Sequence, residues 1–122
     1  MQTTYFGTDG IRGKAGVYPL DKKGATAVGF AVGTYFARSG ATVLVGSDPR
    51  ESSPMLMDAV SSGLAQAGVN VLIVGVIPTP GLAYLAKTSD ALAAIMISAS
   101  HNPYYDNGIK IFRGEGDQLS DQ

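Results

Sequence analysis

The chain has 122 residues and a formal net charge of −1, with 45% apolar and 16% charged residues. This composition is typical of a globular domain with a buried core, and the near-neutral charge gives no indication of binding to nucleic acid or to an anionic membrane surface. There is no cysteine, no secretory signal pattern at the start and no apolar run near the roughly 20 residues that cross a bilayer, so we expect a single soluble, cytoplasmic domain over residues 1–122.

The first predicted element is a helix over Asp21–Ser39, where apolar side chains recur at steps of three and four residues, and Gly40 is a natural stop. Gly29 and Gly33 lie inside this pattern, although each glycine lowers helix propensity by about 1 kcal/mol. We therefore expect them to allow close approach to a neighbouring sheet.

Two further helices are predicted from their start signals. In the first, Ser53 is expected to be the cap and Pro54 the first helical residue, and the helix is expected to end at Gly68. The second is shorter, with Thr79 as the expected cap, and it runs to about Lys87.

Apolar, β-branched runs at Thr42–Gly46, Val69–Val76 and Ala91–Ile97 are typical of buried parallel strands. A strong turn signal at residues 106–108 precedes a short final strand over Ile109–Phe112. The alternation of strands and helices predicts a three-layer α/β/α sandwich around a four-stranded mixed, mostly parallel sheet whose last strand is antiparallel.

Three loops leave the carboxyl ends of the predicted parallel strands, which is the edge where ligands bind in open α/β sheets. They cover residues 47–50, 78–80 and 98–103. The third contains the most reactive side chains, because Ser-Ala-Ser-His-Asn-Pro brings hydroxyl, imidazole and amide groups together after an apolar strand.

Ser100, beside His101, is placed for nucleophilic or phosphoryl-carrying work. A plain turn, in which Ser100 and Asn102 bond their own backbone, explains the same composition. A serine hydrolase is disfavoured, because Gly-x-Ser-x-Gly is absent and adjacent side chains seldom face each other along an extended segment.

A second cluster, Phe6–Gly13, is rich in glycine and contains Arg12. Its backbone amides could approach an anion closely and the guanidinium could bind phosphate in a planar fork, but a glycine-rich turn with a solvated arginine is the alternative. Neither a P-loop nor a dinucleotide-binding glycine pattern occurs in the chain.

Two more basic residues are candidates for a role at the loop edge. Lys110 could donate or accept a proton if burial favours its neutral form, and an exposed lysine on an edge strand is the alternative. Arg50 follows a strand end with Asp48 nearby, so a structural ion pair under the loop is an alternative to a functional role.

Four segments, taken together and in order, resemble the α-D-phosphohexomutase superfamily over nearly the whole chain. They are Phe6–Gly13, Gly46-x-Asp48-x-Arg50, Pro78-Thr79-Pro80 and Ser98-Ala99-Ser100-His101-Asn102-Pro103. The continuation Tyr104–Lys110 is similar to the phosphoglucosamine mutase branch of that superfamily.

This resemblance implies a role for each matching residue. Ser100 matches the serine that is phosphorylated in the resting enzyme and that exchanges its phosphoryl group with a sugar phosphate through a bisphosphate. Arg12 and Lys110 match residues lining the phosphoserine, with Lys110 a candidate for general acid–base work. His101 and Asn102 match the loop that holds the serine.

The implied substrate is a hexosamine phosphate, glucosamine 6-phosphate, and the implied cofactor is one Mg²⁺ bound by phosphorylated Ser100 and by three aspartates of an Asp-x-Asp-x-Asp-Arg motif. That motif is absent from these residues. The resemblance therefore implies the first domain of a multidomain enzyme, with residues 114–122 beginning the linker to a second domain. We expect such a domain to be inactive alone and prone to self-association through apolar faces that later domains would cover.

The loop after the first parallel strand departs from the family's pattern. The family more often has a basic residue at position 47, threonine at 49 and Ser-Gly at 52 and 53, whereas this chain has Ser53. This leaves the geometry around Arg50 open. Two other functions also stay open: a phosphomannomutase or phosphoglucomutase of the same superfamily, and a non-catalytic phosphate-binding relic of the domain.

Overall fold

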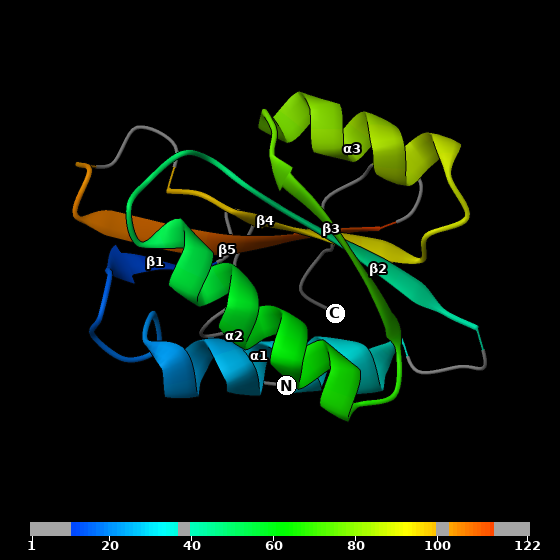
Figure 1. Ribbon diagram of the computed structural model, residues 1–122, viewed down its shortest axis with the longest axis horizontal. Helices are drawn as coiled ribbons and strands as arrows, with labels where there is room; N and C mark the ends of the chain where they lie inside the picture. Colours follow the sequence, from blue (N-terminus) through cyan, green and yellow to red (C-terminus); the bar gives the residue numbers. More distant parts are fainter. Residues whose placement is uncertain (1–10, 37–39, 100–102, 114–122) are drawn as a thin grey trace.

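The computed structural model of the protein describes residues 11–36, 40–99 and 103–113. These residues form five strands and three helices in an alternating order (Figure 1). The elements in chain order are β1 (Ile11–Lys14), α1 (Lys22–Tyr35), β2 (Thr42–Ser47), α2 (Ser53–Gln66), β3 (Asn70–Val76), α3 (Thr79–Thr88), β4 (Ala93–Ile97) and β5 (Asp106–Arg113).

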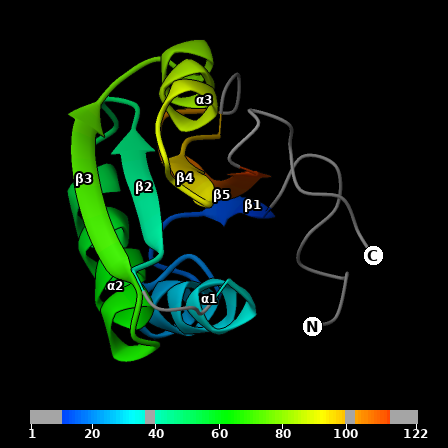
Figure 2. The same cartoon turned by 90° about the vertical axis from the view of Figure 1, so that its right-hand side faces the viewer.

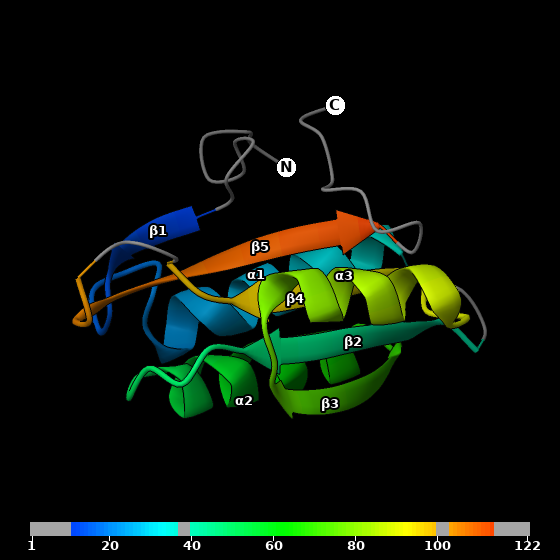
Figure 3. The ribbon, with the colours of Figure 1, turned by 90° about the horizontal axis from the view of Figure 1, so that it is seen from above.

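The five strands form one mixed sheet in the order β1-β5-β4-β2-β3, which can be followed in the view from above (Figure 3). The strands β3, β2 and β4 are parallel, as the apolar runs predicted, and β5 is antiparallel to β4. The predicted count of four strands is wrong, because β1 pairs antiparallel with β5 and adds an edge strand. The sequence Ile-Arg-Gly-Lys is too short for its alternation to separate a strand from a glycine-rich turn.

Helices cover both faces of the sheet, which confirms the predicted three-layer α/β/α arrangement (Figure 2). From β2 the chain passes to β3 on one side and then returns to β4 on the other, so right-handed crossovers place α2 and α3 on opposite faces. One core lies between the sheet and the helices α1 and α2, and includes Val43, Ile95 and Ile109. The other lies under α3 and includes Leu44 and Met96.

Edge strand β3 is less covered than its apolar sequence predicts. Leu72 and Val76 are 56% and 69% exposed, whereas every residue of β4 is buried. The register of β3 against β2 shifts between Val45 and Gly46, where β3 carries one extra residue. An apolar run thus identifies a strand of this sheet without showing how much of it is buried. The self-association expected from the sequence stays a prediction.

The glycines of α1 serve a helix contact rather than the sheet contact that we expected. A Cβ atom on Gly29 would overlap the carbonyl oxygen of Val60 in α2, and one on Gly33 would lie 2.7 Å from the Cβ atom of Ala67. From the other side, a Cβ atom on Gly63 would overlap the carbonyl oxygen of Thr26. The two helices therefore cross backbone to backbone, at a distance that side chains at Gly29 and Gly63 would prevent.

The predicted helix starts are shifted by one residue. Helix α2 includes Ser53, with Ser52 at the N-cap position, and α3 includes Thr79, with Pro78 at the N-cap position; neither residue makes a side-chain capping bond. The hydroxyl of Ser53 is not a cap because it bonds elsewhere, to the carboxylate of Asp48. Helix α1 ends earlier than predicted, with Phe36 as its C-cap, and residues 37–39 lie outside the described ranges.

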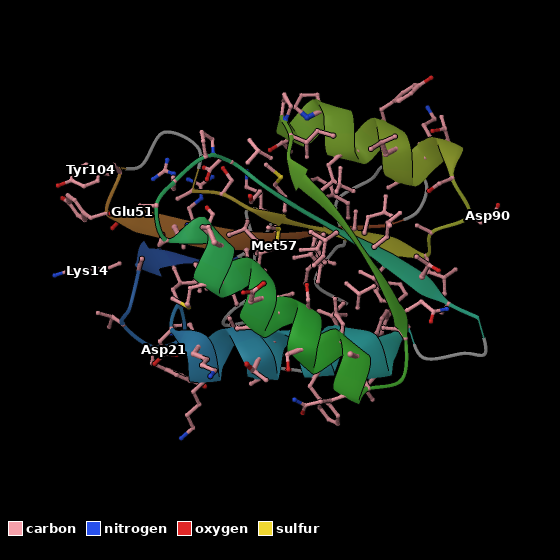
Figure 4. The ribbon with its side chains drawn as sticks, viewed as in Figure 1. Lys14, Asp21, Glu51, Met57, Asp90 and Tyr104 are labelled. Carbon is pink, nitrogen blue, oxygen red and sulfur yellow. The ribbon has the colours of Figure 1, made fainter. Side chains whose placement is uncertain are left out.

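Asp21 caps α1 by accepting a hydrogen bond from the Gly24 backbone amide, with a distance of 2.8 Å between nitrogen and Oδ1 (Figure 4). Because Asp21→Ala leaves this amide without its acceptor, we expect it to lower the free energy of unfolding by about 1 kcal/mol. Asp21→Asn, which keeps a capping oxygen, is expected to lose much less. Urea unfolding of the three proteins measures this difference, and equal midpoints for Asp21→Ala and the parent would contradict it.

None of the helices in the described ranges combines the length and the apolar character needed to cross a membrane.

Candidate phosphoryl-transfer site

The carboxyl ends of β2 and β4 form the point where the strand connections diverge. From β2 the chain leads towards β3, and from β4 it leads towards β5 on the other side, and ligands of open α/β sheets bind at such a point. The loop after β2 is joined there to the last residue of β4, because the Asp48 amide donates to the Ile97 carbonyl at 3.0 Å. In Figure 4, Glu51 after β2 and Tyr104 after β4 lie at the same end of the molecule, and Asp90 lies at the opposite end.

The residues predicted to form a turn at 106–108 belong instead to strand β5. Asp106, Asn107 and Gly108 pair with Lys14, Gly13 and Arg12 of β1, so the strand begins at Asp106 and not at Ile109. The turn signal is overridden because Asn107 makes tertiary hydrogen bonds and because Gly108 occupies a place too narrow for a side chain. A Cβ atom on Gly108 would lie 2.6 Å from the Ile11 carbonyl oxygen and 2.7 Å from that of Ser98.

Arg12 and Lys110 lie on the same face of the sheet. Residues directly opposite each other in an antiparallel pair project to one face, and Arg12 is opposite Gly108, two residues before Lys110. The Cγ atom of Arg12 would lie 3.1 Å from a Cβ atom on Gly108, so the arginine side chain extends over this glycine. Arg12 is exposed and Lys110 is half-buried. The alternative of an exposed lysine on an edge strand is wrong, because β5 lies between β1 and β4.

The strand that leads to Ser100 ends beside these two cations. The Ser98 amide donates to the Gly108 carbonyl at 2.9 Å, and both Ser98 and Ala99 are buried. Ser100, His101 and Asn102 lie outside the described residues, as do residues 6–10 of the glycine-rich cluster. In the sequence, Ser100 directly follows Ala99, and the residue before Ala99 is Ser98, which bonds Gly108.

Arg50 forms an ion pair with Asp48, as the structural alternative from the sequence predicted. Its Nε atom lies 2.9 Å from Oδ2 of Asp48, and its Nη1 atom donates to the carbonyl oxygens of Pro103 at 2.6 Å and Asp106 at 3.0 Å. The Arg50 backbone amide also donates to Oδ1 of Asp48, at 3.2 Å. The guanidinium therefore joins the loop after β2 to the segment that precedes β5.

Asn107 is a polar residue whose role the sequence did not indicate. It is completely buried, and its amide nitrogen donates to the hydroxyls of Ser52 at 2.8 Å and Ser53 at 3.0 Å. Its oxygen accepts from the Gly108 amide at 2.9 Å. Since the Ser53 hydroxyl donates onward to Oδ1 of Asp48 at 3.0 Å, hydrogen bonds run from β5 through α2 to the loop after β2. The serine at position 53 is thus part of the site's framework.

A family comparison places this arrangement among known proteins. Residues 3–122 match the family model described as phosphoglucomutase/phosphomannomutase, alpha/beta/alpha domain I. The chain belongs to the phosphoglucomutase/phosphomannomutase family. Its resemblance to the phosphohexomutases, drawn from four short segments, is confirmed over nearly the whole length.

Curated relatives in this family are named phosphoglucosamine mutases. The chain is 50% identical over 123 aligned residues to phosphoglucosamine mutase 2 of Shewanella frigidimarina, and 53% identical over 118 to the phosphoglucosamine mutase of Idiomarina loihiensis. These alignments cover 100% and 96% of this chain but only 27% and 26% of the relatives. The chain therefore spans about a quarter of the length of these phosphohexomutases.

A solved structure of the family has the same fold. A phosphomannomutase-family protein from Thermus thermophilus is 31% identical to this chain, and superimposes with a TM-score of 0.82 over 93% of this chain and 26% of that one. The two proteins thus share the domain I fold although fewer than a third of their aligned residues are identical.

The described part of this phosphohexomutase domain does not hold a metal site of its own. Among residues 11–36, 40–99 and 103–113, no three His, Cys, Asp or Glu side chains are grouped so that they could bind a metal ion. Asp48, the carboxylate at the loop edge, accepts from Arg50 and from Ser53. The Mg²⁺ implied by the family resemblance does not fit these residues alone.

Proposed function

We propose that this chain is the first domain of a phosphoglucosamine mutase, which interconverts glucosamine 6-phosphate and glucosamine 1-phosphate. Ser100 carries the phosphoryl group. A sugar hydroxyl bonds to the phosphorus as the serine P–O bond breaks, giving a bisphosphate and free serine. Return of the other phosphoryl group restores phosphoserine and releases the isomeric monophosphate. The observation that carries this proposal is that β4, the strand after which Ser100 follows in the chain, pairs with β5, and that Arg12 and Lys110 lie on one face of β1 and β5.

Electrostatics supports this assignment. A phosphoserine carries about −1.5 to −2 charges at pH 7, and an anionic sugar phosphate must approach it. Arg12 and Lys110 are two cationic side chains on one face of β1 and β5. They lie near the carboxyl end of β4, the strand that precedes Ser100 in the chain. Phosphoryl transfer depends on such positioning and charge neutralisation more than on covalent participation of the protein. Of the two, Lys110 is the candidate for proton transfer, because a lysine ammonium can give up a proton whereas a guanidinium stays protonated.

We further propose that the metal comes with the rest of the protein. When bound, Mg²⁺ supplies positive charge to the phosphoryl oxygens. Its ligands would be phosphorylated Ser100 and carboxylates from outside the described residues. Under this proposal the 122-residue chain has no mutase activity by itself, since it contains neither the Asp-x-Asp-x-Asp-Arg motif nor, by the family resemblance, the sugar-binding loops.

The test is the substrate preference of the full-length protein in the presence of Mg²⁺. We expect kcat/KM for glucosamine 6-phosphate to exceed that for glucose 6-phosphate and mannose 6-phosphate by about tenfold or more, the scale of one hydrogen bond to a charged group. A preference for either neutral sugar would overturn the assignment to glucosamine and favour a phosphoglucomutase or phosphomannomutase. Absence of turnover with all three would overturn the mutase itself.

A further inference from the structure

We propose that Arg50 is a positioning residue for the Ser100 phosphoryl carrier. It holds the end of the segment that follows Ser100 against the loop after β2. This inference rests on the proposed function of Ser100. In it, Arg50 contributes to the reaction without touching the substrate. Four features support it: the bonds of Arg50, the attachment of the preceding segment, the burial of the ion pair and the frame beneath it.

Arg50 reaches residues more than fifty positions away in the sequence. Its Nη1 atom donates to Pro103, the first described residue after Ser100, and to Asp106, the first residue of β5. The same guanidinium is oriented by Asp48, which accepts from Nε and from the Arg50 backbone amide. A planar fork with fixed donors can meet a carboxylate and two carbonyls at once, whereas a lysine ammonium is a single point of charge.

The other end of the segment is attached to the same loop. The Asp48 amide donates to the Ile97 carbonyl at 3.0 Å, and the Ser98 amide donates to the Gly108 carbonyl at 2.9 Å. Residues 48–50 therefore bond the chain both before Ser100, at the end of β4, and after it, at Pro103. Two fixed ends limit where the intervening residues can go, because only four peptide bonds separate Ala99 from Pro103.

The ion pair is placed to orient a segment more than to bind a substrate. The side chains of Arg50 and Asp48 are 12% and 19% exposed, and their opposite charges offset each other. Positive charge for the phosphoryl group is available from Arg12 and Lys110 on a different pair of strands. The Nε and Nη1 atoms of Arg50 donate to a carboxylate and to backbone oxygens of the protein itself.

The frame under this pair is a network of hydrogen-bonded polar side chains. Asn107 is completely buried and joins β5 to Ser52 and Ser53, and the Ser53 hydroxyl bonds Asp48. Since satisfied buried networks have few alternative arrangements, Asp48 presents its second oxygen to Arg50 in one orientation. The position of the Pro103 carbonyl is thereby coupled to the core of the domain.

The test uses Arg50→Lys in the full-length protein, with the phosphorylated enzyme mixed with glucosamine 6-phosphate in single-turnover experiments. We expect the rate of phosphoryl transfer from Ser100 to fall by about 10²-fold, as for a misplacement of about 1 Å, while KM changes less than about threefold. A role in stability alone predicts a lower unfolding midpoint and an unchanged single-turnover rate at a temperature where the variant is folded. That result would overturn the proposal.

Two further proteins keep the test decisive. If Arg50→Lys does not fold, Ser53→Ala removes the bond to Asp48 and one bond from Asn107 while leaving the guanidinium, and we expect the same rate to fall by about threefold or more. An unchanged rate in Ser53→Ala would then overturn the proposal. The parent protein distinguishes failure of the role of Arg50 from failure of the proposed function of Ser100. If the parent never acquires a phosphoryl group on Ser100, both proposals fail. If the parent acquires it and Arg50→Lys transfers it equally fast, only the role of Arg50 fails.

Discussion

Replacing Ser100 with alanine in the full-length protein is expected to lower mutase activity by several orders of magnitude, roughly the scale seen when a covalent catalytic residue is removed. The reason is chemical: without the hydroxyl, this position has no oxygen to carry the phosphoryl group. Turnover of glucosamine 6-phosphate with the bisphosphate supplied measures the effect.

Ser98→Ala is the matched control, because it changes the other serine of the same loop. Ser98 is buried directly after β4, and its backbone amide, which the substitution keeps, bonds Gly108. We expect this variant to retain activity within about tenfold, the scale of one lost hydrogen bond. Equal loss in both variants would indicate damage to the loop, and full activity of Ser100→Ala would refute the role of Ser100.

Placing a methyl group at the crossing of α1 and α2 is expected to produce the largest loss of stability. Gly29→Ala should gain about 1 kcal/mol from helix propensity alone. The new Cβ atom, however, would overlap the Val60 carbonyl oxygen, and this atom belongs to backbone that can move only if the helices separate. We therefore expect a net destabilisation of about 1–3 kcal/mol, the usual cost of overpacking a close contact. Urea unfolding with an unchanged m value measures it.

Gly63→Ala and Thr34→Ala complete this experiment. Gly63 meets the Thr26 carbonyl oxygen at the same crossing, so we expect a similar loss, and the double variant Gly29→Ala/Gly63→Ala should lose less than the sum because one separation of the helices accommodates both. Thr34 is exposed on α1 and its replacement should change stability by less than about 0.5 kcal/mol. A more stable Gly29→Ala protein would contradict the helix contact.

The parts of the fold that sequence predicts well are those fixed by local patterns. Apolar runs located the parallel strands within a few residues, the steps of three and four located α1, and the start signals located α2 and α3. What the glycines of α1 contact could not be predicted, because periodicity identifies a buried helix face without identifying the neighbour. Strand β1 was missed for a related reason: its four residues become a strand only through pairing with β5.

The candidate site divides in the same way. Arg12 and Lys110 were identified as candidates from their surroundings in the sequence and from the family resemblance, and pairing of β1 with β5 brings them to one face. The role of Asn107 could not be predicted, since an Asp-Asn-Gly sequence favours a turn, and only tertiary structure places it in a strand, through pairing with β1 and side-chain bonds to Ser52 and Ser53. The bonds from Arg50 to Pro103 and Asp106 likewise depend on tertiary structure.

The most direct test of the central claim is to locate the phosphoryl group itself. The full-length protein is incubated with glucosamine 1,6-bisphosphate, digested, and analysed by mass spectrometry of the peptide that contains Ser98, Ser100 and Tyr104. We expect one added phosphoryl group, on Ser100, which is lost when the enzyme is then mixed with excess glucosamine 6-phosphate in the presence of Mg²⁺. A peptide that stays unmodified, or a phosphoryl group on another residue, would contradict it.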